Sequence, residues 1–227
     1  MTDFAGFPRG TVLFLQDIAA NNTKPWFDDH RTDYEASWLD PARSFVVAMG
    51  ERLADVVPEI VAEPKVNGSI RRINRDTRFS KDKTPYKDHL DIGFWEGDRK
   101  NVLSGFWLRI DPETLGLGVG VHGFDKTRLD RFRDAVVDRK KSESLGHAVA
   151  AVEASGNALH GEHYKRVPAG YEPANEFQER FVRFASLHTG SQVAHPKQLH
   201  SAQFVDWLMA RWEAQLPLHR WLVDELG

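Results

Sequence analysis

One basic segment of the chain carries the side chains best suited to bind an anion. It reads Arg72-Ile-Asn-Arg-Asp-Thr-Arg-Phe-Ser-Lys-Asp-Lys-Thr-Pro-Tyr-Lys87. From Arg71 to Asp88 there are seven Lys or Arg residues against three Asp residues. This window carries +4, so the rest of a chain of net charge −3 carries −7. Guanidinium groups match oxyanions bidentately and ammonium groups add point charge, so the segment predicts a site for a phosphate or carboxylate group.

The residue types in this segment also suggest roles for individual side chains. The predicted ligand-binding residues are Arg72, Arg75, Arg78, Lys81, Lys83, Tyr86 and Lys87. Asp76 and Asp82 are candidate catalytic acid–base groups, or they hold the arginines in place. The alternative is a structural network in which the two aspartates pair with the nearby cations, since charge clusters are often self-paired. Spacing alone leaves both interpretations open.

The second half of the segment has the composition of an ordered loop. Ser80 and Asp82 can bond nearby backbone N–H groups, and Pro85 restricts Thr84 to extended geometry. We expect Phe79 and Tyr86 to anchor this loop by burying against a sheet. The stretch from Ile70 to Asp76 fits a strand or a helix, and its β-branched residues favour a strand.

The first sixty residues have the periodicity of three helices. The first follows Gly10-Thr11, and the second follows Thr23, with Pro25 in its first turn. A third helix is expected to begin at Asp40-Pro41, with Asp40 as its cap, and to stop at Pro58.

The middle of the chain alternates as strands do, and the chain then returns to helical spacing. Alternation covers 90–95, 102–110 and 115–121, with short turns between them, which predicts an antiparallel meander. Helices are expected from Asp125, over 142–153 and over 202–216, and a short strand over 164–167. The predicted fold class is α+β, with N-terminal helices, a central antiparallel β-meander and C-terminal helices packed on the sheet.

Two other motifs give weaker evidence for a functional site. Gly116 to Gly123 contains G-x-G-x-x-G, but Leu117, Val119 and Val121 keep alternating through it, so we favour a close-packed strand over a dinucleotide site. His160 and His163 have ligand-like spacing without a third ligand, so we expect a solvated loop and no metal site. The cofactor is left open.

Composition sets the remaining limits. A chain of 227 residues with 41% hydrophobic content is long enough for a single domain over 1–227. The absence of cysteine excludes disulfides and favours a cytoplasmic location. No run of about 18 apolar residues predicts a membrane span. The acidic remainder argues against a protein that coats nucleic acid.

The basic segment resembles the signature of the domain of unknown function 2461 family. Asn21-Asn22-Thr-Lys-Pro-Trp26-Phe27, the stretch 106–120 and Arg166-Val-Pro-Ala-Gly-Tyr171 resemble further motifs of that family. The resemblance spans about 4–187 and leaves a C-terminal helical extension over about 196–227. It implies a single-domain α+β cytosolic protein without an established activity. It also suggests Asn22 as a ligand-binding residue, although Asn22 could instead cap the second helix and Trp26 could pack in the core.

Three classes of function therefore compete. The first is a site for a small anionic ligand, with or without enzymatic chemistry at Asp76 or Asp82. The second is a nucleic-acid-binding module that combines cations with aromatic rings. The third is a structural or protein-interaction domain with a self-paired Arg/Asp network. The sequence leaves the reaction, the ligand and the oligomeric state open.

Overall fold

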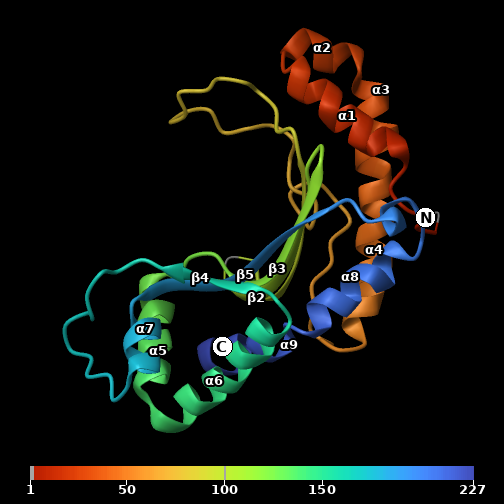
Figure 1. Ribbon diagram of the computed structural model, residues 1–227. Coiled ribbons are helices and arrows are strands. Elements are labelled where there is room, and N and C mark those ends of the chain that lie inside the picture. The colour runs from red at the N-terminus through yellow and green to blue at the C-terminus, as the bar shows by residue number, and fades with distance from the viewer. Residues whose placement is uncertain (1–2, 100) are drawn as a thin grey trace. The chain divides into compact units, whose positions relative to one another are not determined.

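A computed structural model describes residues 3–99 and 101–227 and shows an α+β fold. Its antiparallel sheet has five strands in the order β1-β2-β3-β5-β4. The strands are β1 Leu90–Asp98, β2 Asn101–Ile110, β3 Thr114–Val121, β4 Ala158–Glu162 and β5 Phe184–Ala194. The predicted class, with helices at both ends and a meander between them, is confirmed (Figure 1).

The chain forms two compact units, each assembled from several stretches of sequence. Unit 1 contains residues 3–94, 107–117 and 192–209. Unit 2 contains the described residues of 95–106 together with 118–191 and 210–227. The single domain expected over 1–227 stays a prediction.

The second helix of unit 1 begins directly after Thr23, as the sequence predicts, whereas the first already begins at Arg9, before Gly10-Thr11. Thr23 accepts a hydrogen bond from the backbone N–H of Trp26, and Pro25 lies in the first turn of the helix that follows. The helices are α1 Arg9–Ala20, α2 Lys24–Asp29, α3 Arg31–Tyr34 and α4 Asp40–Ala54.

Helix α4 begins at Asp40 as predicted, but the prediction that Asp40 caps it is wrong, because the chain is already helical before Asp40. A π-helical turn, η1 Glu35–Leu39, joins α3 to α4, and the Asp40 N–H donates to the carbonyl of Glu35. Pro41 has no N–H to donate to the carbonyl of Ser37, one turn earlier. The hydroxyl of Thr11, on α1, donates to this carbonyl instead, at 2.5 Å. A distant side chain therefore permits the proline inside a continuous helix.

Aromatic side chains fill the core of unit 1. Phe45 of α4 has its ring centroid 5.3 Å from that of Phe7, 5.6 Å from that of Phe204 and 6.3 Å from that of Phe94 on β1. Phe94, Ile92 and Leu90 are all buried, so one face of β1 packs on this core. The alternate positions of β1 point to the other face of the sheet.

The glycine-rich stretch forms strand β3, as predicted. A Cβ atom built on Gly120 would lie 2.3 Å from the carbonyl oxygen of Leu187, on the neighbouring strand β5. A Cβ atom on Gly116 would lie 3.1 Å from the ring of Trp107 on β2. The glycines therefore admit a neighbouring backbone and a flat ring within the protein.

Three local predictions need correction. Residues 70–76 form neither a helix nor a continuous strand, but an extended chain with isolated bridges from Ile70 to Ile92 and from Asn74 to Tyr86. The strand expected over 164–167 lies earlier, at β4, which includes His160, so His160 is not in a loop. Strand β5 was not predicted, because Phe184–Ala194 has little apolar alternation, and its place in the sheet depends on pairing with β4 and β3.

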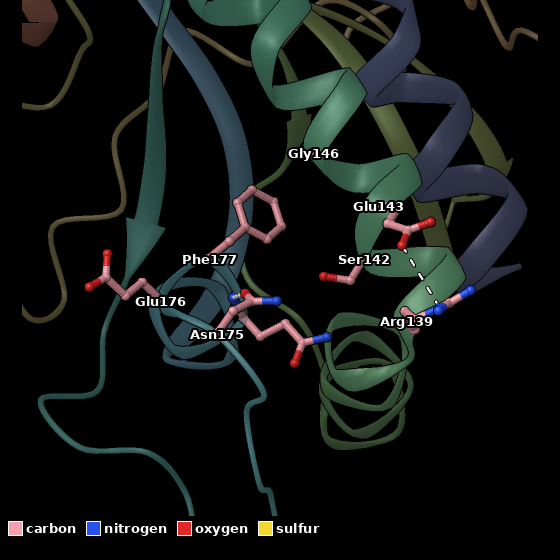
Figure 2. A pocket seen from close by; sticks show the side chains of 8 residues that line it. Arg139, Ser142, Glu143, Gly146, Asn175, Glu176 and Phe177 are labelled. Atoms are coloured by element: carbon pink, nitrogen blue, oxygen red, sulfur yellow. Dashed lines mark hydrogen bonds and ion pairs between the residues drawn. The ribbon is translucent and has the colours of Figure 1, made fainter.

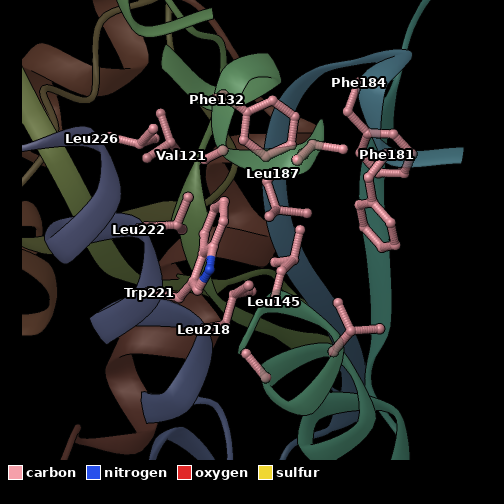
Figure 3. Packing of buried hydrophobic residues seen from close by; sticks show 14 of the residues in the cluster. Val121, Phe132, Leu145, Phe181, Phe184, Leu187, Leu218, Trp221, Leu222 and Leu226 are labelled. Atoms are coloured by element: carbon pink, nitrogen blue, oxygen red, sulfur yellow. The ribbon is translucent and has the colours of Figure 1, made fainter. Parts of the chain in front are cut away.

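Unit 2 packs helices against one face of its strands. Its helices include α5, which begins after Asp125 as predicted and is capped by the Asp125 side chain. The C-terminal region also forms the short 3₁₀ helix η2 and the helix α8. The bounds are α5 Lys126–Val137, α6 Arg139–Ala154, α7 Glu176–Val182, η2 Lys197–His200, α8 Phe204–Glu213 and α9 Leu216–Leu226. Phe132, Leu145 and Trp221 meet Val121 and Leu187 in one buried cluster (Figure 3).

The contact between Thr11 and Ser37 can be tested by one substitution. Thr11 is fully buried, and Thr11→Val would leave the carbonyl of Ser37 without its donor. An unsatisfied buried acceptor costs about 1–3 kcal/mol, so we expect a loss of that size in urea unfolding. Thr32→Val, at an exposed helical position, is the matched control and should change the free energy of unfolding by less than about 0.5 kcal/mol. Equal effects would contradict this account of the π-helical turn.

Candidate functional site

The basic loop, residues 72–87, projects from unit 1 as the gold segment of Figure 1. Its two arms are joined near the base, where the Arg75 N–H donates to the carbonyl of Pro85 at 2.9 Å and the Lys87 N–H donates to that of Ile73 at 2.8 Å. The loop is therefore ordered by its own backbone contacts.

Two arginines of the loop bind aspartates of the same loop. Arg75 Nη1 lies 2.5 Å from Asp82 Oδ2 and also donates to the carbonyl and the hydroxyl of Thr84. Arg78 binds Asp76 bidentately, with Nε 2.9 Å from Oδ1 and Nη2 2.6 Å from Oδ2. These contacts match the structural network that the sequence left open as an alternative.

The same contacts lower the pKa of both candidate acid–base groups. Hydrogen bonds from the Thr84 backbone, from Arg75 and from the Thr84 hydroxyl lower the pKa of Asp82 to about 2. Hydrogen bonds from Arg78 lower the pKa of Asp76. Such carboxylates are weak proton acceptors near neutral pH, so these contacts favour a positioning role. Catalysis by Asp76 or Asp82 stays a prediction.

Three other cations of the loop, Arg72, Lys81 and Lys83, are exposed to solvent and are not neutralised by a paired carboxylate of the described residues. Arg72 and Lys81 are exposed and form no side-chain hydrogen bond or ion pair among the described residues, although Arg72 lies close enough to Asp76 to help lower its pKa. Lys83 donates to the carbonyl of Thr77 at 2.8 Å, which leaves its positive charge unneutralised. Within residues 72–87, the positive charge that no carboxylate neutralises therefore lies on Arg72, Lys81 and Lys83.

The two aromatic residues of the loop have opposite surroundings. Tyr86 is buried and stacks on Phe27 of α2, with ring centroids 4.3 Å apart, so it anchors the loop on a helix. Phe79 is 96% exposed. The prediction that Phe79 is an anchor is wrong, because the residue lies in the turn between Thr77 and Ser80, where the Ser80 N–H donates to the carbonyl of Thr77. The ring remains available for contact.

Asn22 holds the base of the loop. Its Nδ2 donates to the carbonyl of Tyr86 at 2.9 Å, and its Oδ1 accepts the N–H of Tyr86 at 3.0 Å. Asn22 is not the cap of α2, since Thr23 has that role. Trp26 is half-buried and stacks on His30 with ring centroids 4.1 Å apart. These contacts use both polar groups of the Asn22 amide within the protein.

Beside the loop lies a charged centre that the sequence analysis missed. The carboxylate of Asp91, on β1, accepts contacts from three basic side chains. Arg109 Nε lies 2.7 Å from Oδ1, and Lys87 Nζ and His89 Nε2 lie 3.1 and 3.3 Å from Oδ2. His89 also contacts Asp88 through Nδ1 at 2.9 Å. The available signal was that Asp91 and Arg109 are charged residues at the outward positions of otherwise apolar strands.

Burial and pairing move the pKa values of this centre in different directions. Burial raises the pKa of Asp91, but hydrogen bonds from His89 and Arg109 outweigh burial and keep it well below its usual range. Burial lowers the pKa of His89, but bonds to Asp91 and Asp88 outweigh it and raise the value. Burial dominates for Asp111 and raises its pKa. The centre is largely self-neutralised.

A hollow of about 490 Å³ lies elsewhere, in unit 2, between the start of α6 and α7 (Figure 2). Its polar side chains serve local structure: the Asn175 side chain caps α7, and Gln178 bonds Ala174 and Val137. None of the predicted site residues lines it. The lining residues are Arg139, Ser142, Glu143, Gly146, Asn175, Glu176, Phe177 and Gln178.

Within the described residues, no group of three or more His, Asp or Glu side chains is arranged to hold a metal ion. The helices of residues 3–99 and 101–227 include none with the length and apolar character of a membrane span.

Comparison with known proteins places the chain in a family. Residues 10–221 match the family model of DUF2461, which is described as a conserved hypothetical protein. The chain belongs to this family. The match reaches residue 221 and therefore includes α8 and the first part of α9, which the motif resemblance, over about 4–187, left outside. No curated protein and no solved structure matches the chain.

The Asn22 contact with Tyr86 can be measured through stability. Asn22→Ala removes both hydrogen bonds to the Tyr86 backbone in a partly buried position, and we expect a loss of about 1–3 kcal/mol in urea unfolding. Asn21→Ala is the matched control, because the Asn21 side chain is exposed and bonds only the nearby carbonyl of Asp17. A loss for Asn21→Ala as large as that for Asn22→Ala would refute the assigned role.

The charged centre predicts a titration. His89 should titrate above its ordinary pKa of about 6.5, and Asp91→Asn should lower that value, measured by NMR of the imidazole. A raised pKa stabilises the fold below pH 6.5, and the stabilisation disappears as the pH rises through the folded value. Asp17→Asn, at an exposed position, should leave His89 unchanged. If the pKa of His89 is the same in Asp91→Asn as in the wild type, the pairing of His89 with Asp91 is contradicted.

Proposed function

We propose that this DUF2461 protein binds a phosphate- or carboxylate-bearing ligand on the basic loop. The observation that carries the proposal is the cluster of unneutralised charge on Arg72, Lys81 and Lys83. The other cations of the loop are paired, Arg75 and Arg78 within the loop and Lys87 with Asp91 of β1. Exposed cations on an ordered segment attract anions through local charge, even where the whole chain is acidic.

The internal ion pairs support binding by fixing the shape of the loop. Arg75 with Asp82 and Arg78 with Asp76 join residues across its turns. A loop held in one conformation loses less entropy when it binds a ligand. In this proposal the paired arginines, Tyr86 and Asn22 position the loop, and the ligand is met chiefly by Arg72, Lys81 and Lys83.

The exposed ring of Phe79 favours nucleic acid as a second candidate ligand. Arg78 Cζ lies 5.8 Å from the centroid of this ring, so a cation and an open aromatic face occur together. Stacking of a base on an aromatic side chain contributes about 1–3 kcal/mol per base. A single-stranded segment could place one base on Phe79 and its phosphates against the nearby cations.

The third candidate, a purely structural network, explains less. It accounts for Arg75 and Arg78 through their aspartate partners, and for Lys87 through Asp91. It gives no reason for the exposure of Phe79 or for cations that lack a carboxylate partner among the described residues.

A binding experiment tests the proposal. The purified protein is titrated with inorganic phosphate, citrate, AMP and a fluorescein-labelled single-stranded DNA of twelve nucleotides, followed by thermal shift and by fluorescence anisotropy. A ligand that binds the native state raises the unfolding midpoint. We expect Lys81→Ala or Arg72→Ala to weaken the binding of the effective ligand about fivefold to tenfold, which corresponds to about 1–1.4 kcal/mol.

Lys140→Ala is the matched control, because Lys140 is an exposed cation of α6 with no ion pair among the described residues. It should bind as the wild type does. If Phe79→Ala weakens binding of DNA but not of phosphate, and the DNA affinity falls steeply with salt, the nucleic-acid candidate is favoured. If none of these anions binds the wild type, the proposal is refuted.

A further inference from the structure

Three histidines stand side by side across neighbouring strands of unit 2. His188 lies on β5, His160 is its direct partner on β4, and His122 directly follows β3. The ring centroids of His122 and His188 are 3.8 Å apart, and those of His160 and His188 are 5.6 Å apart. We refer to these three residues as the histidine row.

The histidine row lies on the sheet face opposite the helical core. Val121 and Leu187 belong to the buried core, and Leu159 packs against it. Each directly precedes one member of the row, and successive side chains of a strand point to opposite faces. His122 and His160 are exposed, and His188 is half-buried. Protons therefore reach the row from solvent.

The histidines of the row act on one another electrostatically. His122 and His160 act on His188, and His160 acts on His122. The carboxylate of β4, Glu162, lies 3.2 Å from Arg183 Nη2, so it is already paired. Nδ1 of His188 is buried and has no hydrogen-bond partner among the described residues. Charging two adjacent imidazoles would place like charges on directly opposed strand positions, which destabilises strand pairing.

The two strands beside β5 are held with unequal strength. On the β3 side, the hydroxyl of Thr189 bonds both the N–H and the carbonyl of Val119, at 2.8 and 3.2 Å, and contacts Gln215. On the other side, β4 is a five-residue edge strand whose register shifts between His160 and Glu162. Repulsion in the row is therefore relieved more easily by movement of β4 than of β3.

We infer that protonation of the histidine row releases the edge strand β4 from β5, so that mild acid opens this edge of the sheet. The opening uncovers the backbone N–H and carbonyl groups of β5 that face β4. Unpaired groups on an exposed strand edge can pair with another extended chain.

The pH range follows from the direction of the shifts. Burial, with repulsion from His122 and His160, lowers the pKa of His188 to about 4, and burial lowers that of His122. In the open state, in which β4 is released from β5, the histidines bind protons near the ordinary histidine pKa of about 6.5. This state is therefore favoured as the pH falls below about 6.5. The closed state is therefore fully stable above about pH 6.5 and loses stability between about 6.5 and 4.

Hydrogen exchange measured by mass spectrometry at pH 7, 6 and 5 tests the inference. After correction for intrinsic exchange rates, we expect the protection of 158–162 to fall by up to about tenfold per pH unit below 6.5, while α5 and α6 keep theirs. His188→Gln should remove most of this pH dependence. His147→Gln, which changes an exposed histidine of α6, should retain it.

Protection of β4 that is constant from pH 7 to pH 5 would overturn the inference, as would wild-type pH dependence in His188→Gln. If His188→Gln does not fold, His160→Gln removes the opposing imidazole from the exposed edge and is measured in its place. NMR titration of the imidazoles gives a separate readout, because His122, whose pKa is lowered by burial and by His160, should titrate at higher pH in His160→Gln than in the wild type.

Discussion

The carboxylate of Asp91 is the contact on which the candidate site depends. It binds Arg109 of β2 and Lys87 at the end of the basic loop, while the backbone carbonyl of Asp91 accepts the N–H of Arg71 at the start of the loop. One residue of β1 therefore ties both ends of a long loop to the sheet. The cost of burying this carboxylate is offset by several cationic partners at once, which keeps the centre charged and ordered.

Charge pairing divides the cations near the candidate site into those that hold the loop in place and those that are left unpaired. Pairs close in sequence, such as Asp76 with Arg78, shape the loop, and pairs distant in sequence, such as Asp91 with Arg109, fasten its base. The remaining cations of the loop, Arg72, Lys81 and Lys83, belong to neither kind of pair, and they are exposed to solvent, as is Phe79. A charge count cannot distinguish these roles, because a neutralised arginine and a free one contribute equally to it.

The elements that followed from the sequence are those set by neighbouring residues. Thr23 and Asp125 cap helices through backbone groups three residues away, and alternation in β1 and β2 reflects one buried face. The features that the sequence did not predict depend on contacts between residues far apart in the chain. Helix α4 continues through Pro41 because the hydroxyl of Thr11 satisfies the carbonyl of Ser37. Strand β5 exists because β3 and β4 pair with it, which its own composition does not indicate.

The sequence by itself determined the family, the α+β class and the position of the basic segment, because motifs, periodicity and local charge are properties of short stretches. Only the tertiary structure decided which cations stay unneutralised, that Tyr86 is buried while Phe79 is exposed, and that three histidines meet across three strands. The physical reason is that these facts depend on strand register and on contacts between residues far apart in the chain, which no local pattern records.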